Sequence, residues 1–173
     1  MVINGKTLLE LAPIKNMLRT KEREHGVSHG LTEVGYDIRL KQDVRFIPTT
    51  YIRPIVYVTE PGDDPLNDYT KVDGRFTLAS AMEEFQMPPT LVGIVHDKST
   101  WARQGLSVFN TVIEPGWNGF LTLELVFHGN QELHIPAGAG IAQMVFHQLF
   151  NPARYEGKYQ NQEDRPVDAI LER

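Results

Sequence analysis

The sequence contains no cysteine, which excludes disulfide bonds and thiolate metal ligands. It also lacks an apolar run long enough to cross a membrane, and its N-terminal residues, MVINGKTLLELAPIKNML, show no signal-peptide pattern. These absences predict a soluble protein without a membrane partner. We expect it in the cytoplasm, or in the cytoplasm of the host if the chain is viral.

An excess of positive charge is missing as well. The 22 acidic side chains outnumber the 17 basic ones, which gives a formal net charge of -5 at pH 7. No broad basic surface is therefore available to bind a nucleic-acid polymer. A small anionic molecule needs only a local basic pocket, and Lys98, Arg103 and Lys158 are candidates to form one.

The residues that are present predict one domain over residues 1–173 with a mainly β fold. The 11 prolines and 14 glycines lie between short runs of β-forming residues, as in folds with many turns. A short or broken helix is expected at residues 7–19, where Pro13 interrupts apolar residues at helical spacing. Loops are expected at residues 21–29 and 60–68. Strands are expected at residues 36–40, 44–47, 55–59, 75–79, 91–96, 106–113, 120–127, 132–135 and 141–149.

A cationic segment at Lys98, Ser99 and Arg103 is the first candidate site. One helical turn would bring the Ser99 hydroxyl and the Arg103 guanidinium to the same face, since residues four apart are neighbours. The planar guanidinium matches phosphate geometry, lysine adds a point charge, and N–H groups at a helix start add donors. The segment is therefore either an oxyanion site or a solvated basic turn.

Glu124 is the second candidate, because it interrupts an apolar strand. The turn EPGWNG at residues 114–119 separates two expected strands that form a hairpin, and Glu124 lies in the second. A carboxylate buried among Leu, Val and Phe is costly, and its pKa would rise towards neutrality, which suits a general acid or base. Strand alternation equally allows Glu124 to point at solvent.

Five segments, in the same order along residues 35–162, resemble the family of dCTP deaminases and trimeric dUTPases. They are residues 35–40 (GYDIRL), residues 77–80 (TLAS) with Glu83 and Met87-Pro88, residues 98–124, residues 138–146 (GAGIAQMVF) and residues 155–162 (YEGKYQNQ). The resemblance implies a dUTPase-like distorted β-barrel, similar to a jelly roll, with a short N-terminal helix. It also implies a single dCTP deaminase/dUTPase-like domain.

The resemblance implies a role for each matched residue. Glu124 would be the general base that activates water for attack on C4 of cytosine, with Ser99 and Arg103 beside the reacting centre. Thr122 and the backbone at Leu123 would read the base, and Trp117 would pack on the deoxyribose. The remaining substrate-binding residues would be Lys98, Thr100, Glu114, Gln143, Tyr155, Lys158 and Gln162.

The family also implies the cofactor and the assembly. Mg²⁺ would bridge the triphosphate oxygens of the deoxynucleoside triphosphate substrate, without a metal ligand from a protein side chain. Zinc is not expected, because the zinc-dependent nucleobase deaminases need cysteine ligands. The protein would be a homotrimer with active sites between subunits. Residues 151–173, which are polar, would form a mobile lid over the nucleotide.

Two departures from the family pattern keep three activities open. Between Gly105-Leu106 and Glu114 the chain is two residues shorter than usual, which retracts the hairpin tip, and Glu114 replaces the usual aspartate. The extra methylene moves the carboxylate that orients water in the dUTPase branch. We therefore expect hydrolytic deamination of dCTP to dUTP and ammonia. The alternatives are a dUTPase or a bifunctional enzyme forming dUMP, and a catalytically silent nucleotide-binding regulator.

Overall fold

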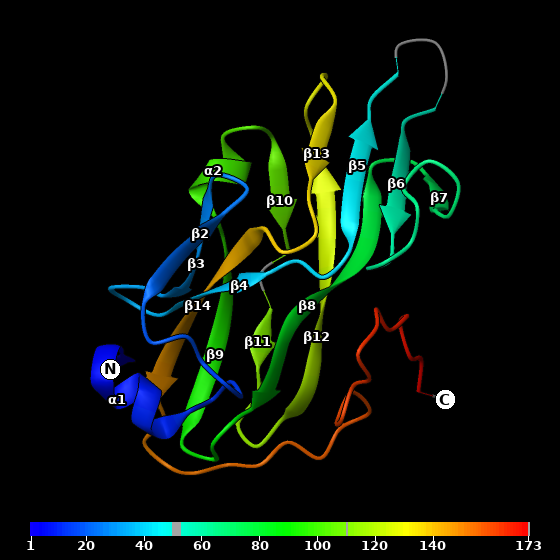
Figure 1. The fold of residues 1–173 in the computed structure, drawn as a ribbon. Coiled ribbons are helices and arrows are strands. Elements are labelled where there is room, and N and C mark those ends of the chain that lie inside the picture. Colours follow the sequence, from blue (N-terminus) through cyan, green and yellow to red (C-terminus); the bar gives the residue numbers. More distant parts are fainter. Residues whose placement is uncertain (50–52, 110, 173) are drawn as a thin grey trace.

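The computed structural model describes residues 1–49, 53–109 and 111–172, and in these residues the chain forms three β-sheets and two short helices (Figure 1). The helices are α1 (Gly5–Leu11) and α2 (Ser99–Ala102). The first sheet has the order β11 (Val112–Ile113), β9 (Leu91–Asp97), β14 (Gly140–Gln148), β4 (Tyr36–Arg39), β3 (Val27–Leu31) and β2 (Lys21–Glu24), and β1 (Val2–Ile3) pairs with β14 outside this path. The second has the order β10 (Leu106–Val108), β12 (Asn118–Phe127) and β8 (Phe76–Gln86). The third has the order β13 (Leu133–Ile135), β5 (Asp43–Ile47), β6 (Ile55–Thr59) and β7 (Thr70–Asp73). The expected mainly β fold with a short N-terminal helix is confirmed.

Alternating burial along the strands gives the sheets a shared apolar core. In β12, Leu123 and Leu125 are fully buried, whereas Glu124 between them is only half-buried. The Phe46 and Phe127 rings, 5.4 Å apart between centroids, join the third sheet to the second. Side chains on the other face of β12 are therefore free to line a site.

The N-terminal helix is shorter than the apolar spacing alone would allow. It ends at Leu11 because Ala12 adopts a left-handed conformation, with φ of 44°, and Pro13 follows. The Ala12 N–H donates to the Leu8 carbonyl, and Leu8 is the residue of the helix that is buried in the core. The prediction of a short helix at this end of the chain is confirmed.

The prediction that residues 21–29 form a loop is wrong. They form most of a hairpin, in which β2 pairs antiparallel with β3 around His25 and Gly26, both at positive φ. Every residue of β2 is exposed, so no apolar alternation marks this strand in the sequence. A charged strand at the edge of a sheet therefore has the same sequence pattern as a loop.

The expected hairpin between residues 106–113 and 120–127 forms only in part. β10 pairs with β12, but β11 pairs with β9 in the other sheet. Asn110 lies outside the described residues. The chain thus changes sheets after Phe109, which the apolar pattern did not reveal because both halves are equally rich in β-forming residues.

The other expected strands form with small shifts of their ends, and the exposed residues 60–68 form a loop as predicted. Two differences are larger. β8 continues through Gln86, and β7 was not predicted, since most of its side chains are exposed.

A buried ion pair ties β4 to β8. Glu83 is 5% exposed and accepts hydrogen bonds from the Arg39 backbone N–H at 2.8 Å and from Arg39 Nε at 2.9 Å. Burial raises the pKa of Glu83, and the bonds from Arg39 offset part of the rise. Without Glu83 the guanidinium would lose its carboxylate partner next to the core.

We expect Glu83→Ala to lower the free energy of unfolding by about 2 kcal/mol, because two hydrogen bonds to a charged group are lost. Urea denaturation at pH 7 measures the change. Its neighbour Glu84, which pairs with Lys15 at the surface, provides the control. Glu84→Ala should cost less than about 1 kcal/mol. Equal effects of the two substitutions would contradict this account of the Arg39–Glu83 pair.

Candidate active site

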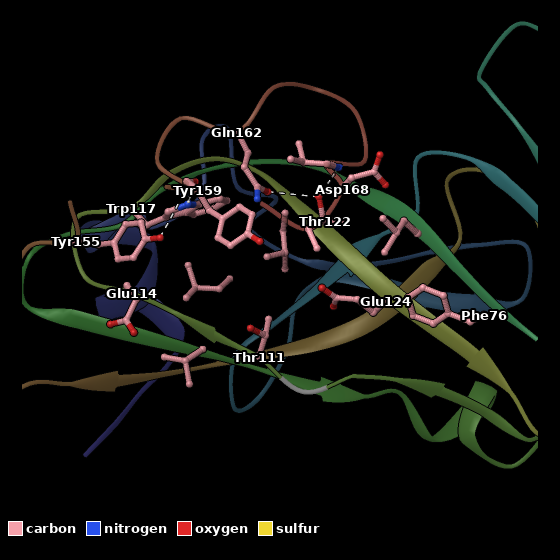
Figure 2. Close-up of a pocket in the computed structure, with 16 residues that line it drawn as sticks. Phe76, Thr111, Glu114, Trp117, Thr122, Glu124, Tyr155, Tyr159, Gln162 and Asp168 are labelled. Atoms are coloured by element: carbon pink, nitrogen blue, oxygen red, sulfur yellow. Dashed lines mark hydrogen bonds between the residues drawn. The ribbon is translucent and has the colours of Figure 1, made fainter. Parts of the chain in front are cut away.

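A cavity of about 580 Å³ opens on the face of β12 that points away from the core. Three parts of the chain surround it: the strands β8 and β12, the segment around β11, and the C-terminal tail (Figure 2). Its lining residues are Phe76, Leu78, Thr111, Val112, Ile113, Glu114, Trp117, Leu121, Thr122, Glu124, Tyr155, Tyr159, Gln162, Val167, Asp168 and Ala169. This volume lies in the range of sites for small molecules.

Glu124 faces this cavity. Figure 2 shows its carboxylate pointing from β12 into the space near Thr122 and Thr111. Burial raises the pKa of Glu124, and its own backbone N–H offsets part of the rise. Within the described residues no other side chain is hydrogen-bonded to the carboxylate. It is therefore a partly desolvated acid, available to exchange a proton with a molecule in the cavity.

Hydroxyl and amide groups stand close to Glu124 on the same wall. Thr122 is buried, and its Oγ1 donates to Gln162 Oε1 at 3.4 Å while accepting from the Val167 N–H at 3.0 Å. Glu114 is exposed at another edge of the cavity (Figure 2). The cavity thus combines an apolar lining with a few polar groups, as sites for small molecules do.

Aromatic rings close one end of the cavity. Trp117 is 5% exposed, packs near Phe85 at 5.9 Å between centroids, and donates from Nε1 to the Tyr159 carbonyl at 2.5 Å. The Tyr155 hydroxyl accepts from the Tyr159 N–H at 3.3 Å. The Nε1 bond thus ties the Trp117 ring to the tail at this end of the cavity.

The C-terminal tail lies along β12 without forming a strand of its own. Gln162 forms a parallel bridge with Gly119, and the Phe120 N–H donates to the Gln162 carbonyl at 3.1 Å. Only glycine suits position 119, because its φ is +127° and a Cβ there would lie 2.5 Å from Gln162 N. Glycine at this position therefore lets the tail approach the cavity wall.

The residues of the cationic segment lie elsewhere. The expected helical turn forms as α2, with Ser99, Thr100 and Arg103 exposed at its surface, and none of them lines the cavity. In the described chain the Arg103 guanidinium has no hydrogen-bond or ion-pair partner. Gln143, on β14, also lies outside the cavity and donates to Thr32 Oγ1 at 3.4 Å. Within one chain, the proposed base Glu124 is therefore apart from the proposed phosphate donors Ser99 and Arg103.

The structure sorts the predicted site residues into groups. Glu114, Trp117, Thr122, Glu124, Tyr155 and Gln162 line the cavity, whereas Lys98, Ser99, Thr100, Arg103 and Gln143 do not. The Leu123 side chain is buried in the core, and the Lys158 side chain is exposed on the tail. Lys158 Nζ donates to the Ile170 carbonyl at 2.5 Å.

Sequence reasoning missed several lining residues, among them Thr111, Tyr159 and Asp168. Tyr159 lies within the tail motif YEGKYQNQ, so its position was a signal that could have found it. Thr111 and Asp168 carry no comparable signal, because they reach the cavity only through the sheet change and the path of the tail.

No group of three or more histidine, aspartate or glutamate side chains in the described residues could hold a metal ion. Nor does any described helix have the length and apolar character that crossing a bilayer requires.

Comparison with known proteins identifies the family. A family model described as dCTP deaminase-like matches residues 8–149. The dCTP deaminase of Campylobacter lari is 36% identical over 154 residues, covering 84% of this chain and 83% of that protein. Those of Chloroflexus aurantiacus (31% over 163 residues, covering 89% and 88%) and Protochlamydia amoebophila (30% over 162 residues, covering 86% and 84%) are similar at comparable length.

Solved structures show the same fold. The native EIAV dUTPase aligns with a TM-score of 0.50 and 20% identity, covering 83% of this chain and 93% of its own. A mutant dUTPase of Staphylococcus aureus phage phi11, in which a structural Mg(II) ion is coordinated, aligns with a TM-score of 0.51 and 15% identity, covering 84% and 94%. The expected dUTPase-like fold is confirmed.

The raised pKa of Glu124 predicts a stability change that depends on pH. Since its pKa is higher in the folded chain than in the unfolded chain, the ionised carboxylate destabilises the fold above both values. Below about pH 4 both states bind the proton and the cost disappears. Glu124→Gln should therefore raise the melting temperature slightly at pH 7 and leave it unchanged near pH 4.

Differential scanning calorimetry across this pH range measures the effect. Glu156→Gln serves as the control, because Glu156 is exposed and has no partner in the described chain. A destabilising Glu124→Gln at pH 7 would show that the carboxylate is held by favourable interactions rather than desolvated.

Proposed function

The chain belongs to the dCTP deaminase-like family, and from that premise we propose that it hydrolyses dCTP to dUTP and ammonia without zinc. One observation carries the proposal: Glu124 is a partly desolvated carboxylate, with a raised pKa, on the wall of a cavity of nucleoside size. The matched sequence order and the identity with dCTP deaminases over most of the chain support the choice of substrate.

In the proposed reaction, Glu124 takes a proton from a water molecule as the water oxygen attacks C4 of the cytosine ring. The tetrahedral intermediate carries the new hydroxyl group and the amino group on C4. Glu124 passes this first proton to N3, then takes the proton of the new hydroxyl group and gives it to the amino group, which leaves as ammonia as the C4 carbonyl of uracil forms. A carboxyl group with a raised pKa suits both transfers, because it acts first as base and then as acid.

The cavity wall would read the base and the sugar. The Thr122 hydroxyl and the backbone at Leu123 lie beside Glu124 on β12 and would contact the pyrimidine edge. Trp117, by its matched position in the family, would pack against the deoxyribose, and its bond to the Tyr159 carbonyl would hold the ring in place. Glu114 would lie at the edge of the cavity, where it would contact the bound nucleotide.

The triphosphate would bind between subunits. Ser99, Thr100 and Arg103 are exposed on α2 and do not reach the cavity of their own chain, so in a homotrimer an adjoining subunit would supply them. Exposed donors around a guanidinium without an acceptor suit an oxyanion. Gln143 would add a donor. Mg²⁺ would enter with the triphosphate and neutralise part of its charge.

The tail would act as a lid. Tyr155, Lys158 and Gln162 belong to it, and in the structure two groups assigned to the nucleotide already bind the end of the tail. Thr122 accepts from Val167, and Lys158 donates to the Ile170 carbonyl. Nucleotide binding would therefore replace these contacts, with the tail moving and closing again over the ligand.

Glu114 favours a second candidate, a bifunctional enzyme that also releases pyrophosphate to form dUMP. Its carboxylate lines the same cavity as Glu124 and has no bonding partner in the described chain. A carboxylate in that place is available to orient a second water molecule. Pyrophosphate release from dUTP by the purified protein distinguishes this candidate from a deaminase alone.

Glu124→Gln should lower the rate of ammonia release from dCTP by at least about a thousandfold, because the base acts in the transition state. The dissociation constant for dCTP should stay within a few fold. Ammonia detection and calorimetric binding measure the two quantities, and Glu156→Gln should match the wild type in both. Undiminished turnover by Glu124→Gln would overturn the proposed mechanism.

Mixing two inactive variants tests whether the sites lie between subunits. Glu124→Gln and Arg103→Ala subunits, unfolded together at equal amounts and refolded, should recover about one quarter of wild-type activity, since that fraction of sites combines two intact residues. Each variant refolded alone should remain inactive. No recovery, with trimers verified by light scattering, would indicate that Glu124 and Arg103 act within the same chain.

A further inference from the structure

Lys98 forms an ion pair with the buried Asp37. Its ammonium group bonds to Asp37 Oδ2 and also donates to Ser28 Oγ at 3.0 Å. The Lys98 and Asp37 side chains are only 11% and 3% exposed. The bonds connect the end of β9 with β4 and β3, so the pair joins strands that are distant in the sequence.

Asp37 depends on Lys98 for compensation of its charge. Its other oxygen, Oδ1, is buried without a hydrogen-bond partner in the described residues. Among the described residues, Lys98 is the only positively charged side chain that bonds to the Asp37 carboxylate, and its other donor is the Ser28 hydroxyl. If Lys98 turned towards a phosphate, the carboxylate would remain buried and unpaired, which is strongly unfavourable.

The pair lies at the point where α2 begins. Lys98 is the residue before Ser99 and caps the helix, since its carbonyl accepts from the Trp101 and Ala102 N–H groups at 3.0 Å. Trp101 provides a second anchor, because its Nε1 donates to the Gly140 carbonyl at 2.7 Å. Two buried contacts thus fix α2 and leave Ser99 and Arg103 at the surface.

We propose that Lys98 is a positioning residue rather than a phosphate ligand, and that Asp37 is the group that holds it. The Lys98–Asp37 pair places α2 so that the exposed Ser99 and Arg103 side chains meet the triphosphate. A neutralised, buried ammonium adds little attraction for phosphate, whereas its anchoring fixes donors that do. The inference rests on the proposed function, because it assigns the phosphate donors of that same site.

A double-mutant cycle tests the inference with Lys98→Met, Asp37→Asn and both changes together. Each single variant leaves one member of the pair unmatched, and should lower the melting temperature and raise KM for dCTP by about tenfold. The kcat should change less than KM. The double variant removes both charges, and should recover most of the stability and a KM within about threefold of the wild type.

A phosphate ligand would give a different result. If Lys98 binds phosphate directly, the double variant will keep the raised KM of Lys98→Met although its stability recovers, and the proposal is overturned. The inhibition constant of deoxycytidine, which lacks phosphates, should change by less than about twofold in all variants. An equal loss for deoxycytidine and dCTP would show a general structural defect and would also overturn it.

Binding measurements separate this inference from the proposed reaction. Calorimetric titration gives the dissociation constants of dCTP and deoxycytidine for the wild type and the three variants. The double-mutant cycle can therefore be completed even if the wild type releases no ammonia. The exposed pair of Lys15 and Glu84 gives the matched control. Lys15→Met with Glu84→Gln should leave stability, KM and binding unchanged.

Discussion

The candidate site depends on one constraint of the backbone: after β10 the chain leaves the sheet of β12 and pairs with β9 instead. The Phe109 N–H still donates to the Glu124 carbonyl, whereas the Thr111 carbonyl accepts from Val95. Had the segment continued to pair with β12, it would have occupied the space beside Thr122 and Glu124 that the cavity now takes. The change of partner opens a cavity there, and the flanking Phe109 and Thr111 each keep a backbone hydrogen bond to their own sheet.

That cavity explains how an acidic residue persists in an apolar strand. Glu124 points away from the core between Leu123 and Leu125, so it loses only part of its hydration. The tail completes the enclosure by lying on β12 where Gly119 permits close approach. A raised pKa is therefore a result of the architecture, and the chemistry proposed for Glu124 uses that property.

Much of this could be predicted from the sequence. The fold class, the family, the helical turn at Ser99 and the β12 strand follow from local patterns and from the order of the motifs. The hairpin of β2 and β3 could not, because charged residues on an edge strand resemble a loop. The direction of Glu124 was also undecided, since alternation has period two and fits either face.

The sequence by itself determined which chemical groups are available and the local structures that carry them: an acid in an apolar strand, a basic helical turn and a polar tail. Only the tertiary structure decided which groups meet. It brought Thr122 to Gln162, 40 residues later, and committed Lys98 to Asp37, 61 residues earlier. The physical reason is that local patterns report propensity and spacing, whereas burial and pairing arise from strands that associate across the chain.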